Sequence, residues 1–203
     1  MKIYIDFDGT LFNNNKHYHK LINILKKYNI NEEYINNLTK KKHYKNLDTL
    51  AKEIIDKNNL DKSIINEINN IYSDDLIYKD TLPFLEKYKE EYELILLTLG
   101  NKKYQLKKIN STNISKYFKK IIITNKDKSK LNIDYQNNIF IDNNPHELKK
   151  FYNSKSKHLI RIKRKNDKYS KINLDIKNTP EFKDFNELLE SNYIKKLGEI
   201  NYE

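Results

Sequence analysis

The amino-acid sequence predicts an α/β protein in which helices flank a parallel sheet and a small all-helical unit is inserted after the first strand. Short apolar runs that read as strands alternate with helical patterns in residues 1–14 and 79–203. This order is typical of a Rossmann-like parallel sheet. Residues 15–78 show only the helical spacing of apolar side chains. In addition, polar side chains stand where three separate strands end.

The first strand is the short apolar run Ile3-Tyr4-Ile5, because branched and aromatic residues favour strands. The run stops at two aspartates, and Gly9 then permits a sharp turn. Residues i and i+2 of a strand point to the same face, so a regular strand would place the carboxylates of Asp6 and Asp8 side by side. Such charges raise each other's pKa unless a cation lies between them, and Mg²⁺ suits that position.

The inserted unit is predicted from four successive helical patterns. The residues at or near the starts of these helices are His17, Asn31, Asn46 or Asp48, and Asp61. No strand pattern interrupts them. We therefore expect residues 15–78 to form one domain and residues 1–14 and 79–203 to form the α/β core.

Strands and helices alternate in the rest of the chain. We expect a helix from Asp80 to Tyr92, strands at 93–98, 119–124, 138–142 and 158–162, and helices at 145–152 and 180–190. Asp6, Thr98 and Asp142 each end a predicted strand. Because ligands of such sheets sit at the carboxyl ends of the strands, these three side chains are expected at one ligand-binding edge.

The run Asp6-Phe7-Asp8-Gly9-Thr10 after an apolar strand resembles the first motif, DxDGT, of the haloacid dehalogenase (HAD) superfamily of phosphotransferases and phosphatases. The strand ending in Thr98 is similar to the second motif, and the strand ending in Asp142 is similar to the fourth. The resemblance covers most of the chain. It implies that residues 15–78 are a helical cap that closes over the active site.

The resemblance also implies a role for each motif residue. Asp6 would be the nucleophile that forms an aspartyl-phosphate, and Asp8 would be the general acid and base. The dehalogenases of the superfamily lack this second aspartate, so Asp8 favours phosphoryl transfer over carbon–halogen chemistry. The hydroxyl of Thr98 and the amides of the turn at Leu99 and Gly100 would bind a phosphoryl oxygen.

The third motif of the superfamily is a lysine that neutralises the nucleophile and the phosphate. Lys126, Lys128 and Lys130 all precede the strand at 138–142. We assign the role to Lys128, in Asp127-Lys128-Ser129, where a helix is expected to start. The other two would then be ordinary solvated lysines.

The resemblance implies one Mg²⁺ ion, bound by Asp6, the main-chain carbonyl of Asp8, and Asp142. The sequence departs from the family pattern after Asp142, where the family often has a second acidic residue. Here the neighbour is Asn143, and the next acid is Glu147. Asn143 could supply a neutral oxygen, or Glu147 could orient water.

Residues of the cap would choose the substrate. We expect the core-facing side of the cap, including Tyr18 or His19, to line the pocket over Asp6. His17 and His43 also lie in or near this stretch. A lone histidine in such a place is more often a surface residue than a catalytic one.

The net charge is +11, from 39 Lys and Arg against 28 Asp and Glu. This balance invites a nucleic-acid partner, but only Arg161 and Arg164 are arginine, and the excess of Asn, Lys, Ile and Tyr indicates a compositional bias. The basic segment Lys155–Lys171 is either a strand edge with a loop or a nucleic-acid track. We therefore expect a small phosphorylated substrate and favour a nucleic-acid partner less.

The chain has no cysteine, which excludes disulfides and thiolate metal sites. No apolar run approaches the roughly 20 residues of a membrane helix, and the N-terminus has no signal-peptide pattern. We expect a cytoplasmic protein without a membrane partner. The sequence does not indicate the oligomeric state.

We therefore expect a Mg²⁺-dependent phosphatase of small phosphate monoesters. One alternative is a 5′-nucleotidase or a nucleic-acid end phosphatase, which the positive charge would favour. A second alternative is a catalytically inactive HAD-like binding module, against which the intact Asp6, Asp8, Thr98 and Asp142 argue.

Overall fold

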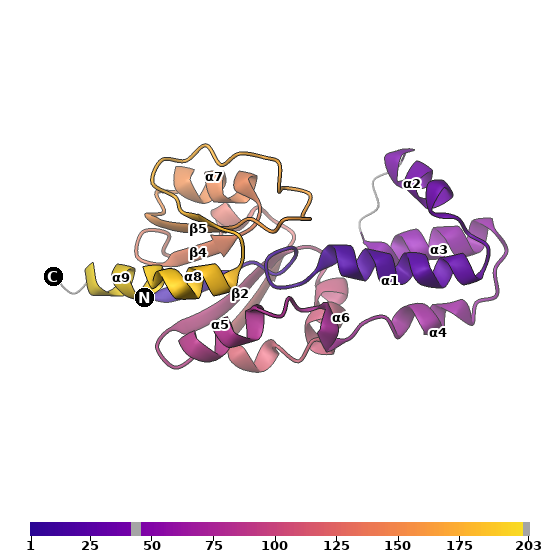
Figure 1. Cartoon of the computed structure of the whole chain (residues 1–203), viewed down its shortest axis with the longest axis horizontal. Coiled ribbons are helices and arrows are strands. Elements are labelled where there is room, and N and C mark those ends of the chain that lie inside the picture. The colour runs from indigo at the N-terminus through magenta and orange to yellow at the C-terminus, as the bar shows by residue number, and fades with distance from the viewer. Residues whose placement is uncertain (42–45, 201–203) are drawn as a thin grey trace.

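A six-stranded parallel sheet lies at the centre of the α/β core (Figure 1). The structure is a computed structural model and describes residues 1–41 and 46–200. The strands are β1 (Lys2–Ile5), β2 (Glu93–Leu99), β3 (Lys120–Thr124), β4 (Ile139–Asp142), β5 (His158–Ile162) and β6 (Glu181–Phe182). Their order across the sheet is β3-β2-β1-β4-β5-β6. Because β1 pairs in parallel with both β2 and β4, the predicted α/β class is confirmed.

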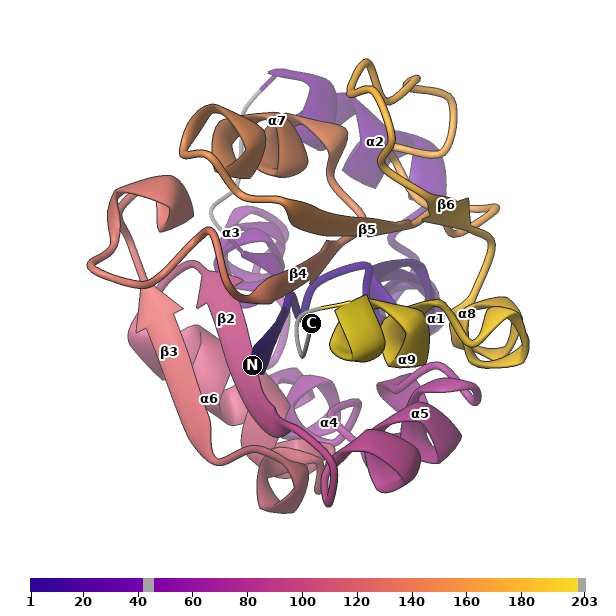
Figure 2. The same ribbon diagram turned by 90° about the vertical axis from the view of Figure 1, so that its left-hand side faces the viewer.

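Helices cover both faces of the sheet. Helices α5 (Thr81–Tyr88), α6 (Lys102–Ser111), α8 (Phe185–Ser191) and α9 (Tyr193–Ile200) pack on one face, and α7 (Pro145–Asn153) packs on the other (Figure 2). The side chains of β1 point alternately to the two faces of the sheet. Ile3 and Ile5 join the first hydrophobic cluster, whereas the ring of Tyr4 stacks on Phe140 at 4.9 Å in the other.

Four helices between β1 and β2 form a separate group, which we call the helical unit. They are α1 (Asn14–Lys27), α2 (Glu32–Lys41), α3 (Leu47–Lys57) and α4 (Ile64–Asn69), and they lie at one end of the molecule (Figure 1). Their buried faces share a hydrophobic cluster of their own, which includes Leu21, Leu25, Ile54 and Ile64. Three short 3-10 helices complete the elements at Asp74–Leu76, Ser115–Tyr117 and Lys128–Lys130.

Asparagine side chains start three of these helices. Asn13 caps α1, Asn31 accepts the Tyr34 N–H at 2.7 Å ahead of α2, and Asn46 caps α3. The caps before α2 and α3 agree with the sequence, which left Asn46 or Asp48 open for α3. The polar break expected at residues 13–15 is shorter, because α1 already begins at Asn14. His43 lies outside the described residues.

The helix predicted at 180–190 is wrong in its first third. Residues 181–182 form β6, because the Arg161 and Lys163 N–H groups donate to the carbonyls of Pro180 and Phe182 at 3.0 and 2.7 Å. Helix α8 begins only after Asp184, whose side chain caps it. A two-residue strand is too short to show an alternating pattern, so the sequence does not separate β6 from the helix that follows it.

Both arginines are buried in the core. Arg161 donates to the Asn143 carbonyl at 3.2 Å, and Arg164 donates to Asp80 at 2.7 Å and to the Thr10 carbonyl at 2.9 Å. They therefore hold loops of the core together. Residues 158–162 of the basic segment form β5, as the strand interpretation of residues 155–171 predicts. In the part of the chain that the structure describes, no helix is long and apolar enough to cross a membrane.

Candidate active site

The predicted motif residues meet at the carboxyl edge of the sheet. Asp6 and Asp8 follow β1, Thr98 is the last residue but one of β2, and Asp142 ends β4. Because β1 lies between β2 and β4, the ends of these three strands are neighbours. This is the edge at which open α/β sheets bind ligands.

Lys128 joins the carboxylates of Asp6 and Asp142. Its Nζ donates to Asp6 Oδ1 at 2.5 Å and to Asp142 Oδ2 at 2.9 Å, and all three side chains are buried. The short helix at Lys128–Lys130 carries it, with Asp127 as the capping residue. Lys126 and Lys130 are exposed, so of the three candidate lysines Lys128 is the one that reaches the carboxylates.

When both carboxylates are ionised, this trio carries two negative charges and one positive charge. Burial and the charge of Asp142 raise the pKa of Asp6 to about 7, although Lys128 opposes them. Burial likewise raises the pKa of Asp142. Burial alone would lower the pKa of Lys128, but Asp142 and Asp6 outweigh it and raise that pKa, so the ammonium stays charged. The site is therefore one positive charge short of neutrality.

The turn after β1 is packed tightly against Asn143. Gly9 has a φ of 83°, and a Cβ atom on it would collide with the Asn143 side chain, so only glycine fits here. The Thr10 hydroxyl donates to Asp6 Oδ2 at 3.1 Å and accepts the Asn143 N–H at 3.0 Å. The Thr10 hydroxyl, which the Asn143 N–H orients, therefore holds Asp6 Oδ2, the carboxylate oxygen that Lys128 does not contact.

Helix α6 holds the carboxylate of Asp8. Gln105 Nε2 lies 2.7 Å from both Asp8 Oδ2 and Thr98 Oγ1, and the Lys108 ammonium pairs with Asp8 Oδ1. Burial opposes the charge of Asp8, but Lys108 and Gln105 outweigh it and lower the pKa of Asp8. Sequence reasoning missed Gln105 and Lys108. Their spacing of three, beside the core residue Ile109, was the available signal.

The turn predicted to bind a phosphoryl oxygen is partly occupied by protein groups. The Thr98 hydroxyl is buried and faces Gln105. The Gly100 N–H donates to the Thr124 carbonyl at 2.8 Å, so the expectation that this amide is free is wrong. The Leu99 side chain is exposed, and its carbonyl accepts from Gln105 at 3.1 Å. The Gly100 amide is used because it extends the pairing of β2 with β3.

A cleft of about 420 Å³ opens beside Asp8, between the helical unit and α6. Its walls include His17, Tyr18, Leu47, Leu50, Tyr104 and Lys108. Of the predicted cap contacts, Tyr18 lines this cleft, which includes Asp8 but not Asp6 among its lining residues. His19 is exposed and is not among the lining residues. His17, which the sequence favoured less, is buried in the cleft wall.

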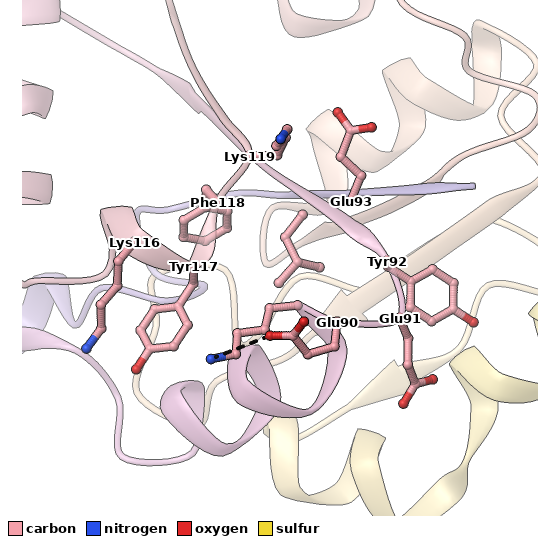
Figure 3. A pocket seen from close by; sticks show the side chains of 10 residues that line it. Glu90, Glu91, Tyr92, Glu93, Lys116, Tyr117, Phe118 and Lys119 are labelled. Atoms are coloured by element: carbon pink, nitrogen blue, oxygen red, sulfur yellow. Dashed lines mark ion pairs between the residues drawn. The ribbon is translucent and has the colours of Figure 1, made fainter.

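A second hollow lies at the opposite end of β2, near Glu93 (Figure 3). In Figure 3 the charged ends of Glu91, Glu93 and Lys116 point away from one another. The ion pair drawn there joins Lys89 and Glu90 at 3.9 Å. The hollow lies at the end of the sheet opposite Asp6, because Glu93 pairs with Lys2 at the start of β1. We place the candidate site at the cleft beside Asp8.

The donors at the carboxyl edge fit a hard divalent cation. Within residues 1–41 and 46–200, no three acidic or histidine side chains form a metal cluster. Mg²⁺, however, is commonly bound through one or two carboxylates together with substrate phosphate and water. Asp6 and Asp142 supply two carboxylates with an excess negative charge. Asn143 Nδ2 and Glu147 Oε2 are buried without a hydrogen-bond partner in the described part of the chain.

No protein-family model matches this sequence, and no curated protein matches it. Many solved structures share its fold. A HAD phosphatase from Thermococcus onnurineus is 17% identical, with a TM-score of 0.63 over 95% of this chain and 98% of the other. The L-2-haloacid dehalogenase RSc1362 is 13% identical, with a TM-score of 0.62 over 94% and 97%.

A third similar structure is the HAD-hydrolase candidate YfnB from Bacillus subtilis, which is bound to magnesium. It is 10% identical, with a TM-score of 0.61 over 95% of this chain and 98% of the other. At such identities the likeness concerns the fold. The sheet order, the placement of Asp6, Thr98 and Asp142, and these matches agree: the chain has the fold of the HAD superfamily, as its motifs predict.

Proposed function

We propose that this protein is a Mg²⁺-dependent phosphatase that hydrolyses a small phosphate monoester through an aspartyl-phosphate on Asp6. One observation carries the proposal: Asp6, Lys128 and Asp142 converge at the carboxyl edge of the sheet, and Asp8 stands beside them at the mouth of a cleft. A nucleophile, an acid/base and compensating positive charge are the groups that phosphoryl transfer needs.

The reaction would take place in two displacements. A carboxylate oxygen of Asp6 attacks phosphorus while the bond from phosphorus to the ester oxygen breaks, and protonated Asp8 gives its proton to that oxygen. Water then attacks the phosphorus of the aspartyl-phosphate, and Asp8 takes the proton from the water. Inorganic phosphate leaves and the Asp6 carboxylate is restored. Lys128 keeps its protons throughout and offsets the phosphoryl charge.

The surroundings of Asp8 suit the second displacement directly. Lys108 and Gln105 lower the pKa of Asp8 in the free protein, which favours the ionised, basic form. A phosphate dianion bound at Asp6 adds negative charge nearby and raises the pKa of a carboxyl group. Substrate binding itself would therefore load Asp8 with the proton that the first displacement needs.

Asp6, Asp142 and the main-chain carbonyl of Asp8 would hold Mg²⁺. The ion would supply the missing positive charge and lower the cost of bringing a phosphate dianion to two buried carboxylates. Asn143 or Glu147 would support its water ligands.

The fold by itself does not choose between phosphatases and dehalogenases, since structures of both kinds are similar to this one. Asp8 favours phosphoryl transfer, because a leaving alkoxide needs a proton and a leaving halide does not. The proposal of an inactive binding module does not explain why two carboxylates that repel each other are buried together with Lys128.

The helical unit would act as the cap. It is connected to the core by the turns near Asn13 and Tyr78, and the cleft lies between it and α6. Closure would exclude water from the phosphoryl group and fix the rest of the ester. Tyr18, on the cleft wall, would contribute to the choice of ester.

The test uses the purified protein with p-nitrophenyl phosphate and a panel of small phosphate esters. We expect turnover with Mg²⁺, its loss in excess chelator and its return when Mg²⁺ is restored. A parallel arm with 2-chloropropionate should release no chloride. Full activity in excess chelator would rule out the metal requirement, and chloride release without phosphate release would rule out the phosphatase.

A further inference from the structure

The cleft beside Asp8 holds groups that phosphoryl transfer does not use. Its volume of about 420 Å³ lies in the range of roughly 300–1,000 Å³ that is typical of small-molecule sites. Asp8, Lys168 and residues of α1, α2, α3 and α6, Lys108 among them, line it. Asp8 is the one motif residue among the described residues that line this cleft. Because Asp8 would protonate the leaving group, an ester whose phosphate meets Asp6 would extend that leaving group past Asp8 into the cleft.

His17 is the most informative group in the wall. Its side chain is 1% exposed, and its ring packs edge-on against Phe12 at 5.3 Å and Tyr72 at 4.7 Å. Its Nε2 atom is buried and has no hydrogen-bond partner within the residues the structure describes. Buried polar atoms nearly always have a partner. Because Nε2 is closed to solvent in this structure, a ligand in the cleft would reach it once the helical unit has moved away from the core.

The protonation state of His17 restricts which chemical groups of a ligand can bind to it. Burial, assisted by the charge of Lys108, lowers the pKa of His17 to about 4. The imidazole is therefore neutral near pH 7, and it can donate or accept one hydrogen bond. A neutral ring buried among aromatic side chains matches an uncharged polar group of a ligand.

The rest of the wall combines flat apolar surface with amide groups. Tyr18, Tyr104, Leu47 and Leu50 supply the rings and the aliphatic surface. The amide side chains are those of Asn14, Asn15 and Asn46. The Asn46 Oδ1 atom caps α3 and the Asn15 Nδ2 atom donates to the Asn166 carbonyl, so each of these two amides has its other end left for a ligand. Rings of this kind stack on planar groups, and an amide can add one hydrogen bond to the edge of a planar base.

Charge excludes one class of leaving group. Two lysines, Lys108 and Lys168, line the cleft. Asp8 is the only acid among the described lining residues, and it is already paired with Lys108 and Gln105. A leaving group with an ammonium ion would meet two cations. A plain sugar would leave the apolar wall unmatched, and an alkyl chain would leave His17 and the amides unmatched.

We propose that this cleft binds the nucleoside half of a nucleoside monophosphate, with the base against the Tyr104 and Leu47 wall and one hydrogen bond to His17 Nε2. The proposal rests on the phosphatase function for the phosphate half. It does not need catalysis for the nucleoside half, because the cleft would bind a free nucleoside as well.

The first experiment compares two histidine variants. His17→Phe keeps an aromatic ring between Phe12 and Tyr72 but removes the hydrogen bond, and His19→Phe changes the exposed neighbour outside the cleft. For His17→Phe we expect the ratio of kcat/KM for a nucleoside monophosphate to kcat/KM for phenyl phosphate to fall about tenfold, as loss of one buried hydrogen bond predicts. His17→Gln, which can still hydrogen-bond, should recover part of that ratio. His19→Phe should leave the ratio unchanged.

The second experiment needs no turnover. Equilibrium dialysis of the wild-type protein in chelator, with a radiolabelled purine or pyrimidine nucleoside as the probe, measures the cleft alone. We expect saturable binding that ribose 5-phosphate does not displace and that His17→Phe weakens about tenfold.

The two experiments separate the two proposals. Nucleoside binding without phosphatase activity would overturn the proposed function and keep this inference. Turnover of phosphate esters with no preference for nucleoside monophosphates, and no nucleoside binding to the wild-type protein, would overturn this inference and keep the phosphatase. An unchanged ratio in a folded His17→Phe variant would also overturn it.

Discussion

Asp6 combines the position of a nucleophile with surroundings that disfavour its charge. Its carboxylate lies against Lys128 at 2.5 Å, whereas burial and Asp142 raise the pKa of Asp6 to about 7. We expect Asp6→Asn to lower turnover at least about 1,000-fold, because an amide cannot form the aspartyl-phosphate. Phosphate release and circular dichroism on the same sample check this. Substantial activity in a well-folded Asp6→Asn variant would contradict the covalent mechanism.

The raised pKa of Asp6 also predicts how stability depends on pH. Between its unfolded value of 3.8 and about 7, the folded protein keeps a proton on Asp6 that the unfolded chain releases. The free energy of unfolding contributed by this group therefore falls as pH rises through that window. In chelator, Asp6→Asn should gain in Tm over the wild type as the pH is raised from 5 to 8.

Thermal unfolding of both proteins across that pH range measures the effect, and Mg²⁺ provides the internal control. Mg²⁺ should raise the Tm of the wild type at pH 8 more than that of the variant, because the variant lacks a ligand. Parallel Tm curves for the two proteins in chelator would show that ionisation of Asp6 does not destabilise the folded protein, which would contradict the prediction.

The position of Lys128 was only partly predictable from the sequence. The order of the motifs restricted the lysine to Lys126, Lys128 or Lys130, but spacing alone did not separate them. The separation comes from the short helix at Lys128–Lys130, which buries Lys128 and leaves its neighbours in solvent. A single 3-10 turn has no periodic signal, so the choice of Lys128 from the sequence depended only on the helix start expected after Asp127, and the structure has that start.

Among the elements, α6 does more than cover the sheet. It presents Gln105 and Lys108 to Asp8 and Thr98, and the Lys108 ammonium also lies 4.9 Å from the Tyr104 ring centre. The strands and their motifs were predictable because apolar runs ending in acids are a local signal. The inward polar face of α6 was not, because lysine and glutamine usually mark the solvent face of a helix.

The ion pair between Lys108 of α6 and Asp8 can be tested by comparing substitutions at two lysines of the same helix. Lys108→Met keeps the buried stem but removes the charge, so the pKa of Asp8 should rise toward its ordinary value. We expect kcat to fall about 10- to 100-fold, within the contribution of general acid–base catalysis. Lys103→Met, on an exposed position of the same helix, should keep wild-type kcat. Steady-state kinetics on one aryl phosphate compares them, and equal kcat in both variants would remove Lys108 from the acid–base machinery.

Over the whole molecule, the helical unit and the core meet through α6. Lys107 donates to Asp48 of α3 and to Asn69 of α4, both at 2.9 Å, and its ammonium lies 4.0 Å from the Tyr72 ring centre. The Leu47 N–H donates to the Tyr104 hydroxyl at 3.3 Å. The ion pair of Lys107 with Asp48 is partly exposed, with 31% and 38% of the two side chains accessible, and a single pair of this kind stabilises little. These contacts therefore fit a closure that can open in each catalytic cycle.

The absence of cysteine from the sequence allows this opening to be blocked cleanly. In a double variant with Asp48→Cys and Lys107→Cys, a short bis-methanethiosulfonate reagent would link α3 to α6 through bonds that a reductant cleaves. If the helical unit must open to exchange ester and product, the linked protein should turn over phosphate esters at least about tenfold more slowly. Reductant should restore the rate of the same sample.

The two single-cysteine variants, treated with the same reagent, control for the loss of the Lys107–Asp48 ion pair and for the added groups. They should keep their untreated rates. If the linked protein instead works at the rate of its reduced form, the cleft exchanges ligands without opening, and the helical unit is a fixed wall of the site. A substrate would then have to enter past Lys168 at the cleft rim, which would favour flexible esters over bulky ones.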